Sequence, residues 1–329
     1  MIYKETQVTK SGSAMAEQVG KLLVEDMKAD PVLKESVYRE DNDMSNSTDF
    51  YTTKLASAIY YKSYDKFQQY FDMVWNLTPA DVGSMDGAGA YKIPKLISAT
   101  AAKVSGGEVV DYINDNKDSV TLETDTYAIG TRINRRLLKR AGKGIIARLL
   151  TVASDAVLRA VCTDLINGMI SAAATANTVT GEISYAKVEE SKRLIKSSTD
   201  DNSQKFGLMP DFIGFTETGW EKYITDTTIV AMVGYGQRNV PGQKLDNDYQ
   251  VVQGLKVTDI ALATGTKNSK TVRAIVVDSM NFMCFLKETE METYDGRLPG
   301  TPGDEEVIHA MDAGYIAINT SGGSVITTA

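Results

Sequence analysis

The sequence is poor in the residues on which much enzyme and metal chemistry depends. Its 329 residues include one histidine, His309, and two cysteines, Cys162 and Cys284. A zinc site built from three histidines is therefore impossible within one chain, and the HExxH pattern of zinc proteases is absent. Two cysteines are too few for the disulfide framework of a small secreted domain, so we expect two buried free thiols.

No familiar catalytic or nucleotide-binding pattern fills this gap. The sequence has no GxSxG elbow, no paired Cys-x-x-Cys, no Rossmann fingerprint and no EF-hand loop. The glycine-rich segment 232–242 lacks the GK[ST] ending of a phosphate-binding loop. His309 lies in a segment that we expect to lead into the C-terminal strands rather than to supply a base. We therefore predict no catalytic residues, no cofactor and no metal ligands, and we predict that the protein is not an enzyme.

Charge and hydropathy argue against two further classes of protein. The chain carries 35 basic and 43 acidic residues, and its net charge of −8 argues against a general nucleic-acid binder. No apolar run reaches the roughly 18 residues of a membrane-spanning helix, so we expect no membrane partner. Hydrophobic residues make up 43% of the chain, as in an ordinary globular protein.

The most informative segment runs from residue 128 to residue 174. It begins as the end of a β-like segment and continues through a run of basic residues. After a break at Gly142-Lys-Gly144, a helical pattern extends from Ile145 to Ala174. Such a helix would be about 45 Å long, whereas globular helices usually have about 8–20 residues. This length is typical of a helix that spans a long distance rather than of a helix that lines a pocket.

The basic run contains no acidic residue, and three interpretations of it remain open. Its members are Arg132, Arg135, Arg136, Lys139, Arg140 and Lys143. They could form a solvated helix face, or they could form salt bridges with acidic residues in the N-terminal segment of another copy, such as Glu35, Glu40 and Asp41. They could also contact nucleic acid, although the net negative charge of the chain disfavours this.

On the N-terminal side of this segment, the sequence predicts helices followed by a β-loop. Apolar spacing favours helices over residues 14–29 and 48–75, and Thr78-Pro79 ends the second. Short strands are expected at 91–93, 108–113 and 119–127. These strands carry too few apolar residues to form a core, and an isolated hairpin is marginal in water. We therefore expect a projecting β-loop that packs against a partner elsewhere.

On the C-terminal side, residues 182–300 predict a compact α/β unit. We expect helices at 185–197 and 217–225, and strands at 210–215, 257–262, 272–277 and 282–286. The last residues, 315–326, contain two β-like stretches around Ser321-Gly-Gly-Ser324 and predict a closing hairpin.

This order of segments resembles the major capsid proteins of tailed bacteriophages, which share the Hong Kong 97 fold. Residues 126–138, TYAIGTRINRRLL, resemble the strand that leads into the spine helix of that family. Residues 210–220, PDFIGFTETGW, are similar to the strand and helix that open its axial domain, and residues 252–257, VQGLKV, to a later glycine-marked strand. The stretches are short, so their order from about residue 84 onward carries the resemblance.

The resemblance implies an α+β fold of Hong Kong 97 type, with an N-terminal arm, an extended β-hairpin loop, a long spine helix and an α/β axial domain. The implied bounds are 1–83 for the arm and its helices, 84–130 for the extended loop, 131–181 for the peripheral domain with the spine helix, 182–300 for the axial domain, and 301–329 for C-terminal strands that return to the peripheral domain.

The resemblance also implies a function. The protein would self-assemble into pentamers and hexamers that form an icosahedral shell around double-stranded DNA, without sequence-specific contact to that DNA. It would be made in the host cytoplasm and reside in the virion, with scaffold, portal and decoration proteins as further partners. The inter-subunit residues expected on this basis are Arg132, Arg135, Arg136, Lys139, Arg140, Gly234, Gly236 and Arg238, with the loop 234–242 near the symmetry axes.

Some relatives crosslink a lysine of the extended loop to an asparagine of a neighbour. Lys92, Lys95, Lys103 and Lys117 lie in or near this loop, but nothing in the sequence identifies the partner asparagine. Two alternatives to a phage capsid remain. One is the shell protein of an encapsulin-type cellular compartment, and the other is a small-molecule enzyme built on the α/β unit.

Overall fold

The computed structural model describes residues 60, 63–82, 90–95, 119–199, 203, 205–234, 251–263, 265–289, 292–297 and 304–328. It describes the backbone alone at residues 80, 94, 132–147, 231–234, 292–297 and 304–307. The chain divides into two compact units. The first unit contains residues 1–68, 126–161 and 289–312, and the second unit contains residues 69–125, 162–288 and 313–329. This division cuts across the domain bounds expected from the sequence.

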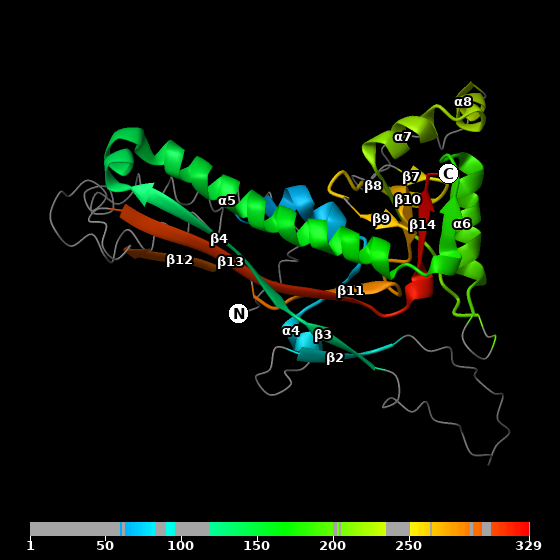
Figure 1. Cartoon of the computed structure of the whole chain (residues 1–329), viewed down its shortest axis with the longest axis horizontal. Helices are drawn as coiled ribbons and strands as arrows, with labels where there is room; N and C mark the ends of the chain where they lie inside the picture. Colours follow the sequence, from blue (N-terminus) through cyan, green and yellow to red (C-terminus); the bar gives the residue numbers. More distant parts are fainter. Residues whose placement is uncertain are drawn as a thin grey trace, which may run out of the picture. The chain divides into compact units, whose positions relative to one another are not determined.

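The long helix α5 (Arg135–Ala172) passes through both units and is longer than the sequence predicted (Figure 1). The predicted break at Gly142-Lys-Gly144 is wrong, because the helix continues through these residues without interruption. A glycine in a helix interior costs only about 1 kcal/mol relative to alanine. Two glycines among leucine, lysine, arginine and alanine residues therefore do not stop a helix that tertiary packing supports.

In the first unit, α5 is preceded by strand β4 (Asp125–Asn134), as the stretch 126–138 predicted. Strand β4 pairs with β13 (Asp304–Ala317), and β13 pairs antiparallel with β12 (Glu292–Arg297). The apolar face of α5 is buried here at Leu150, Ala153 and Val157, in agreement with the helical pattern of the sequence, whereas Ala160 is exposed.

Residues 63–71 form a helix that is tied to α5 within the first unit. The Lys66 ammonium lies 2.8 Å from a carboxylate oxygen of Asp155. The predicted helix over 48–75 extends too far, because strand β1 (Trp75–Leu77) follows instead and pairs in parallel with β11 (Met283–Lys287) in the second unit. A four-residue helix, α4 (Pro79–Val82), comes next, with Thr78 and Asp81 hydrogen-bonded at its start.

The second unit is built around a mixed sheet of seven strands (Figure 1). Its strands are β5 (Thr178–Thr180), β6 (Phe212–Phe215), β7 (Val251–Val252), β8 (Leu255–Asp259), β9 (Thr266–Lys267), β10 (Lys270–Val277) and β14 (Gly323–Thr327). The order is β5-β14-β10-β6-β8-β7, with β9 paired to β10. The helices are α6 (Tyr185–Ser197), α7 (Glu217–Ile224) and α8 (Thr227–Gly234).

These three helices share one apolar core with the sheet. Val188 and Ile195 of α6, Tyr223 of α7 and Ile229 of α8 belong to the same cluster of buried residues. Ala274 and Val276 of β10 join that cluster, and residues two apart on a strand point to the same face. The three helices therefore cover one face of the sheet. Short 3-10 turns at Thr175–Asn177 and Thr320–Gly322 lead into β5 and β14.

Two predicted strand placements are wrong. Strand β11, expected in the α/β unit, pairs with β13 and β1 instead of joining the sheet of β10. The C-terminal hairpin does not form, because β13 and β14 belong to different sheets and β14 pairs with β10 and β5. The predicted turn at Ser321-Gly-Gly does form, but it leads the chain from the sheet of β13 into the sheet of β14 instead of joining the two strands as a hairpin.

Candidate assembly surfaces

The described part of the predicted β-loop is a two-stranded hairpin in the second unit. Strand β2 (Ala90–Pro94) pairs antiparallel with β3 (Ser119–Glu123), with Tyr91 opposite Leu122. The hairpin packs into an apolar cluster that also contains residues of β1 and β11 and Ile318, which follows β13. Its buried members are Leu77, Tyr91, Ile93, Leu122, Cys284, Leu286 and Ile318. The base of the hairpin is therefore held by burial, while the predicted strand at 108–113 lies outside the described residues.

A carboxylate also fastens the hairpin to the end of β11. The Tyr91 hydroxyl donates to one oxygen of Glu288 at 2.8 Å, and the Thr124 hydroxyl donates to the other at 2.5 Å. The hydrogen bond to Glu288, together with desolvation and the nearby negative charge, raises the pKa of Tyr91. Gly314 of β13 lets the hairpin approach, because a Cβ at this position would lie 2.3 Å from the Glu123 carbonyl oxygen.

The basic run expected to contact other subunits is divided between two elements. Arg132 lies in β4, and Arg135, Arg136, Lys139 and Arg140 occupy the first turns of α5. The spacing of these four helical positions groups them along one side of the helix. The first turn of α5 carries no acidic residue, so its charges oppose the usual preference of a helix N-terminus for negative groups.

The glycine-rich segment falls mostly beyond the described residues. Gly234 is the last residue of α8, whereas Gly236 and Arg238 lie outside the described part of the chain. Of the candidate crosslinking lysines, Lys92 lies in β2 and Lys95 follows it. Lys103 and Lys117, the acidic residues Glu35, Glu40 and Asp41, and the predicted helix at 14–29 also lie outside the described residues. Their expected roles stay predictions.

The C-terminal end of α5 is locked by the β9–β10 hairpin of the second unit. The Lys267 ammonium donates to the carbonyl oxygens of Ser171 and Ala173 at 2.7 and 2.6 Å. The Gly265 backbone NH donates to the side-chain oxygen of Asn167 at 2.8 Å. A lysine among the last carbonyls of a helix satisfies unpaired acceptors and complements the helix dipole. Sequence analysis missed this contact, because only the tertiary fold brings β9 to the helix end.

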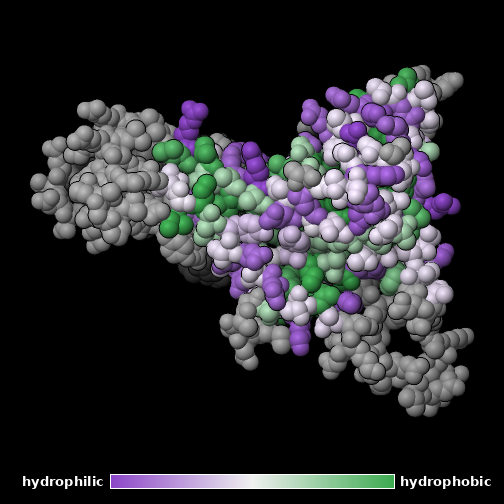
Figure 2. Space-filling view, viewed as in Figure 1, coloured by the Kyte–Doolittle hydropathy of each residue, from purple (hydrophilic) through white to green (hydrophobic). Residues whose placement is uncertain are grey.

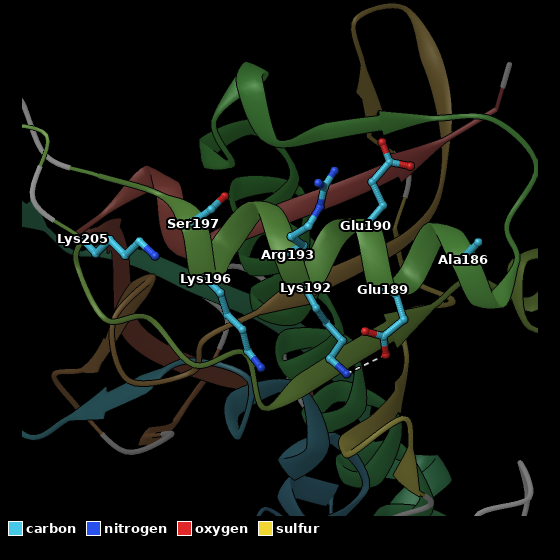
Figure 3. A pocket seen from close by; sticks show the side chains of 8 residues that line it. All are labelled: Ala186, Glu189, Glu190, Lys192, Arg193, Lys196, Ser197 and Lys205. Carbon is cyan, nitrogen blue, oxygen red and sulfur yellow. Dashed lines mark hydrogen bonds and ion pairs between the residues drawn. The ribbon is translucent and has the colours of Figure 1, made fainter.

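The outer surface of α6 forms an open, charged concavity of about 650 Å³. Figure 3 shows the eight residues that line it, all of which belong to α6 except Lys205 in the segment that follows. Within it the Lys192 ammonium lies 2.8 Å from a Glu189 carboxylate oxygen and also donates to the Gln253 carbonyl. This shape and lining differ from the deep apolar pocket that would favour a small-molecule enzyme.

The neighbouring surface of α7 and α8 is mixed in character. Hydrophilic residues cover much of the visible face around α7 (Figure 2). Glu217 and Glu221, both exposed, are four residues apart and lie on the same side of α7. Among the described side chains of these helices, Ile224 of α7 and Val230 of α8 are apolar and exposed.

The three residues that could have suggested reactive chemistry are buried. Cys162 and Cys284 are free, and burial raises the pKa of both thiols, that of Cys284 to about 12. His309 lies in β13 and is fully buried, and desolvation lowers its pKa. Within the described ranges, no cluster of histidine, cysteine or acidic side chains could hold a metal ion. No helix among the described residues is long and apolar enough to cross a membrane.

Comparison with known proteins finds likeness in structure without likeness in sequence. No family model matches the chain, and no curated protein matches it. The capsid of cyanophage P-SCSP1u superposes with a TM-score of 0.56 at 10% identity, covering 78% of this chain and 87% of the capsid chain. A structure from Mycobacterium phage Bobi superposes with a TM-score of 0.55 at 12% identity, covering 79% and 90%.

An encapsulin has the same fold. The SrpI encapsulin of Synechococcus elongatus superposes with a TM-score of 0.52 at 12% identity, covering 73% of this chain and 82% of the encapsulin chain. At such low identities the likeness establishes the fold. The fold predicted from the order of the sequence segments is thereby confirmed. The chain has the Hong Kong 97 fold of the major capsid proteins of tailed phages.

Proposed function

We propose that this chain is the major capsid protein of a tailed phage and that it self-assembles into pentamers and hexamers forming an icosahedral shell around double-stranded DNA. The observation that carries the proposal is the likeness to the cyanophage capsid, which covers 78% of this chain and 87% of that one. The shared part includes most of the chain, so it is more than one common α/β motif. The location would be the virion, after synthesis in the host cytoplasm.

The geometry of the described residues supports a role in building a shell. Helix α5 has 38 residues and is about 57 Å long at 1.5 Å per residue. The β2–β3 hairpin is fixed at its base by an apolar cluster and by Glu288. A rigid strut and a fixed hairpin base direct segments toward neighbouring copies, and such segments cover large areas with few residues.

The expected domains are proposed with two changes. Residues 1–83 would form the arm, 84–130 the extended loop, 131–181 the peripheral domain and 182–300 the axial domain. Strand β14 belongs with the axial sheet because it pairs with β10, and β11 belongs with β13. The basic run from Arg132 to Arg140 and the loop from Gly234 would contact other subunits. Scaffold, portal and decoration proteins would be further partners.

Electron microscopy together with size-exclusion chromatography of the purified protein tests this proposal. We expect closed shells, or rings of five and six copies, that form at high protein concentration. A uniform small species that never assembles, either alone or when co-expressed with the neighbouring structural genes, would contradict it.

An encapsulin-type shell is the second candidate, because the SrpI encapsulin superposes almost as well. The content of the shells separates the two. Shells of a phage capsid retain double-stranded DNA when they are isolated from lysed, phage-producing cells. Shells of an encapsulin enclose a cargo protein that carries a short docking peptide.

A further inference from the structure

Helix α6 and Lys205 carry more positive charge than the described acidic side chains around them neutralise. Lys187 pairs with Glu190 and Lys192 with Glu189, each at 2.8 Å. Three cations of the same concavity, Arg193, Lys196 and Lys205, are exposed and have no ion-pair partner among the described residues (Figure 3). Lys196 lies in the last turn of α6, where it complements the helix dipole. That account does not extend to Arg193 or Lys205.

Helix α7 carries the opposite excess. Lys222 is already paired with Glu182 at 2.5 Å, and Asp226 accepts hydrogen bonds from the backbone NH groups of Tyr185 and Thr228. Glu217 and Glu221 are exposed and have no ion-pair partner in the described part of the chain. Glu217 suits the first turn of α7, whereas Glu221 lies beyond that turn. Two exposed carboxylates are therefore left on one side of this helix, near one further cation, Arg273, whose guanidinium donates to the Thr218 hydroxyl in the first turn of α7.

We infer that the basic surface of α6 (Arg193, Lys196 and Lys205) binds the acidic side of α7 (Glu217 and Glu221) of a second copy of this chain. The two surfaces differ, so the contact is heterologous, and a heterologous contact that repeats around an axis closes a ring. The inference rests on the proposed function, because it supplies one of the contacts by which copies would form pentamers and hexamers.

Charge is the reason to choose a second copy as the occupant. With a net charge of −8, copies of this chain repel one another unless positive patches meet negative ones. The unpaired positive and negative sets lie on two helices of the same unit, so each copy offers both halves of the contact. Complementary charges across an interface also select the correct partner surface and orientation.

Charge reversal tests the inference. Variant one carries Arg193→Glu and Lys196→Glu, and variant two carries Glu217→Lys and Glu221→Lys. We expect each variant alone to raise the protein concentration needed for ring or shell formation by about tenfold or more, because attraction becomes repulsion at every contact. The effect should shrink in high salt, which screens exposed charges. Circular dichroism and thermal melting establish that each variant is folded.

Combining the variants makes the test sharp. A chain with all four reversals should assemble at nearly the wild-type concentration, because both surfaces exchange sign. An equimolar mixture of the two single-surface variants should also assemble, and it should form rings with even numbers of copies because the variants must alternate. As a matched control, Glu182→Lys with Lys222→Glu reverses a pair that is already satisfied within one chain, so it should leave assembly unchanged.

The outcomes separate this inference from the proposed function. If the wild-type protein does not assemble, the proposed function fails. If the wild-type protein assembles and the single-surface variants assemble equally well, this inference is wrong while the proposed function stands. Failure of the four-reversal chain to recover assembly would also overturn it. So would variants that assemble normally but lose binding to DNA, since the basic surface would then serve nucleic acid.

Discussion

Removing the Glu288 carboxylate should loosen the base of the β2–β3 hairpin. Glu288→Ala deletes the acceptor of two hydrogen bonds, from Tyr91 at 2.8 Å and from Thr124 at 2.5 Å. A hydrogen bond to a charged group contributes about 1.5–3 kcal/mol, and partial exposure of Glu288 and Thr124 reduces that value through solvent screening. We expect the free energy of unfolding to fall by about 2–4 kcal/mol for the two bonds together.

Two measurements check this value. Chemical denaturation gives the free energy, and hydrogen exchange gives its location, since amides of residues 90–94 and 119–123 should exchange faster while those of β10 do not. Glu182→Ala is the matched control, because its carboxylate is 61% exposed and its ion pair with Lys222 lies at the surface. Equal losses for Glu288→Ala and the control, or exchange that rises uniformly, would refute the reasoning.

The hydrogen bond between Tyr91 and Glu288 predicts that the stability of the protein depends on pH in the alkaline range. The hydrogen bond to Glu288 is the largest cause that raises the pKa of Tyr91. A group whose folded pKa lies above its unfolded value, about 10 for tyrosine, contributes stability that is fully present below that value and is lost as pH rises through the folded pKa. The stability advantage of the wild-type protein over Tyr91→Phe should therefore be constant near neutral pH and disappear above pH 10.

Three further predictions concern the second unit. Lys267→Met removes two hydrogen bonds to the end of α5 and should lower the free energy of unfolding by about 1–3 kcal/mol in denaturant titrations. The value is modest because the ammonium is desolvated, which also lowers the pKa of Lys267 and offsets part of the stabilisation by the two bonds. Lys270→Met is the control. Gly314→Ala would place a Cβ 2.3 Å from the Glu123 carbonyl oxygen, so thermal melting should show a loss of at least about 1–3 kcal/mol, and unchanged stability would contradict the close approach. Cys162 and Cys284 should react with a thiol reagent at pH 8 only upon unfolding, because burial raises the pKa of both; labelling of the native protein at the rate of a free thiol would disprove this.

Elements with strong local signals were predictable from the sequence. The helix expected at 185–197 matches α6, because Ser184 caps its start through a hydrogen bond to the Lys187 NH and apolar residues recur at helical spacing. The strand and helix at 210–225 correspond to β6 and α7, where Thr216 caps the helix in the same way. Such boundaries depend on residues that lie three or four positions apart, so the sequence alone contains them.

Pairing between distant segments was not predictable in the same way. Strand β11 is buried at Met283, Cys284 and Phe285, a pattern that suits the centre of either sheet, so the sequence could not choose between β10 and β13 as its neighbour. The contacts of Glu288 and Lys267 join residues separated by at least 94 positions. Neither residue lies in a recognisable motif, which is why sequence analysis did not select them.

Two electrostatic features are left unbalanced by the residues that the structure describes. Arg135 and Arg136 begin α5, where the helix dipole disfavours positive charge by about 0.3–1 kcal/mol each. Several exposed charges of α6, α7 and Lys205 likewise have no ion-pair partner in the described part of the chain. Packing along the buried face of α5 stabilises the helix enough to tolerate the unfavourable dipole interaction of Arg135 and Arg136. The helix dipole accounts for Lys196 and Glu217 but not for the two arginines, Arg193, Lys205 or Glu221. These remaining charges become favourable once a surface of opposite charge is supplied from outside, as assembly of many copies would do.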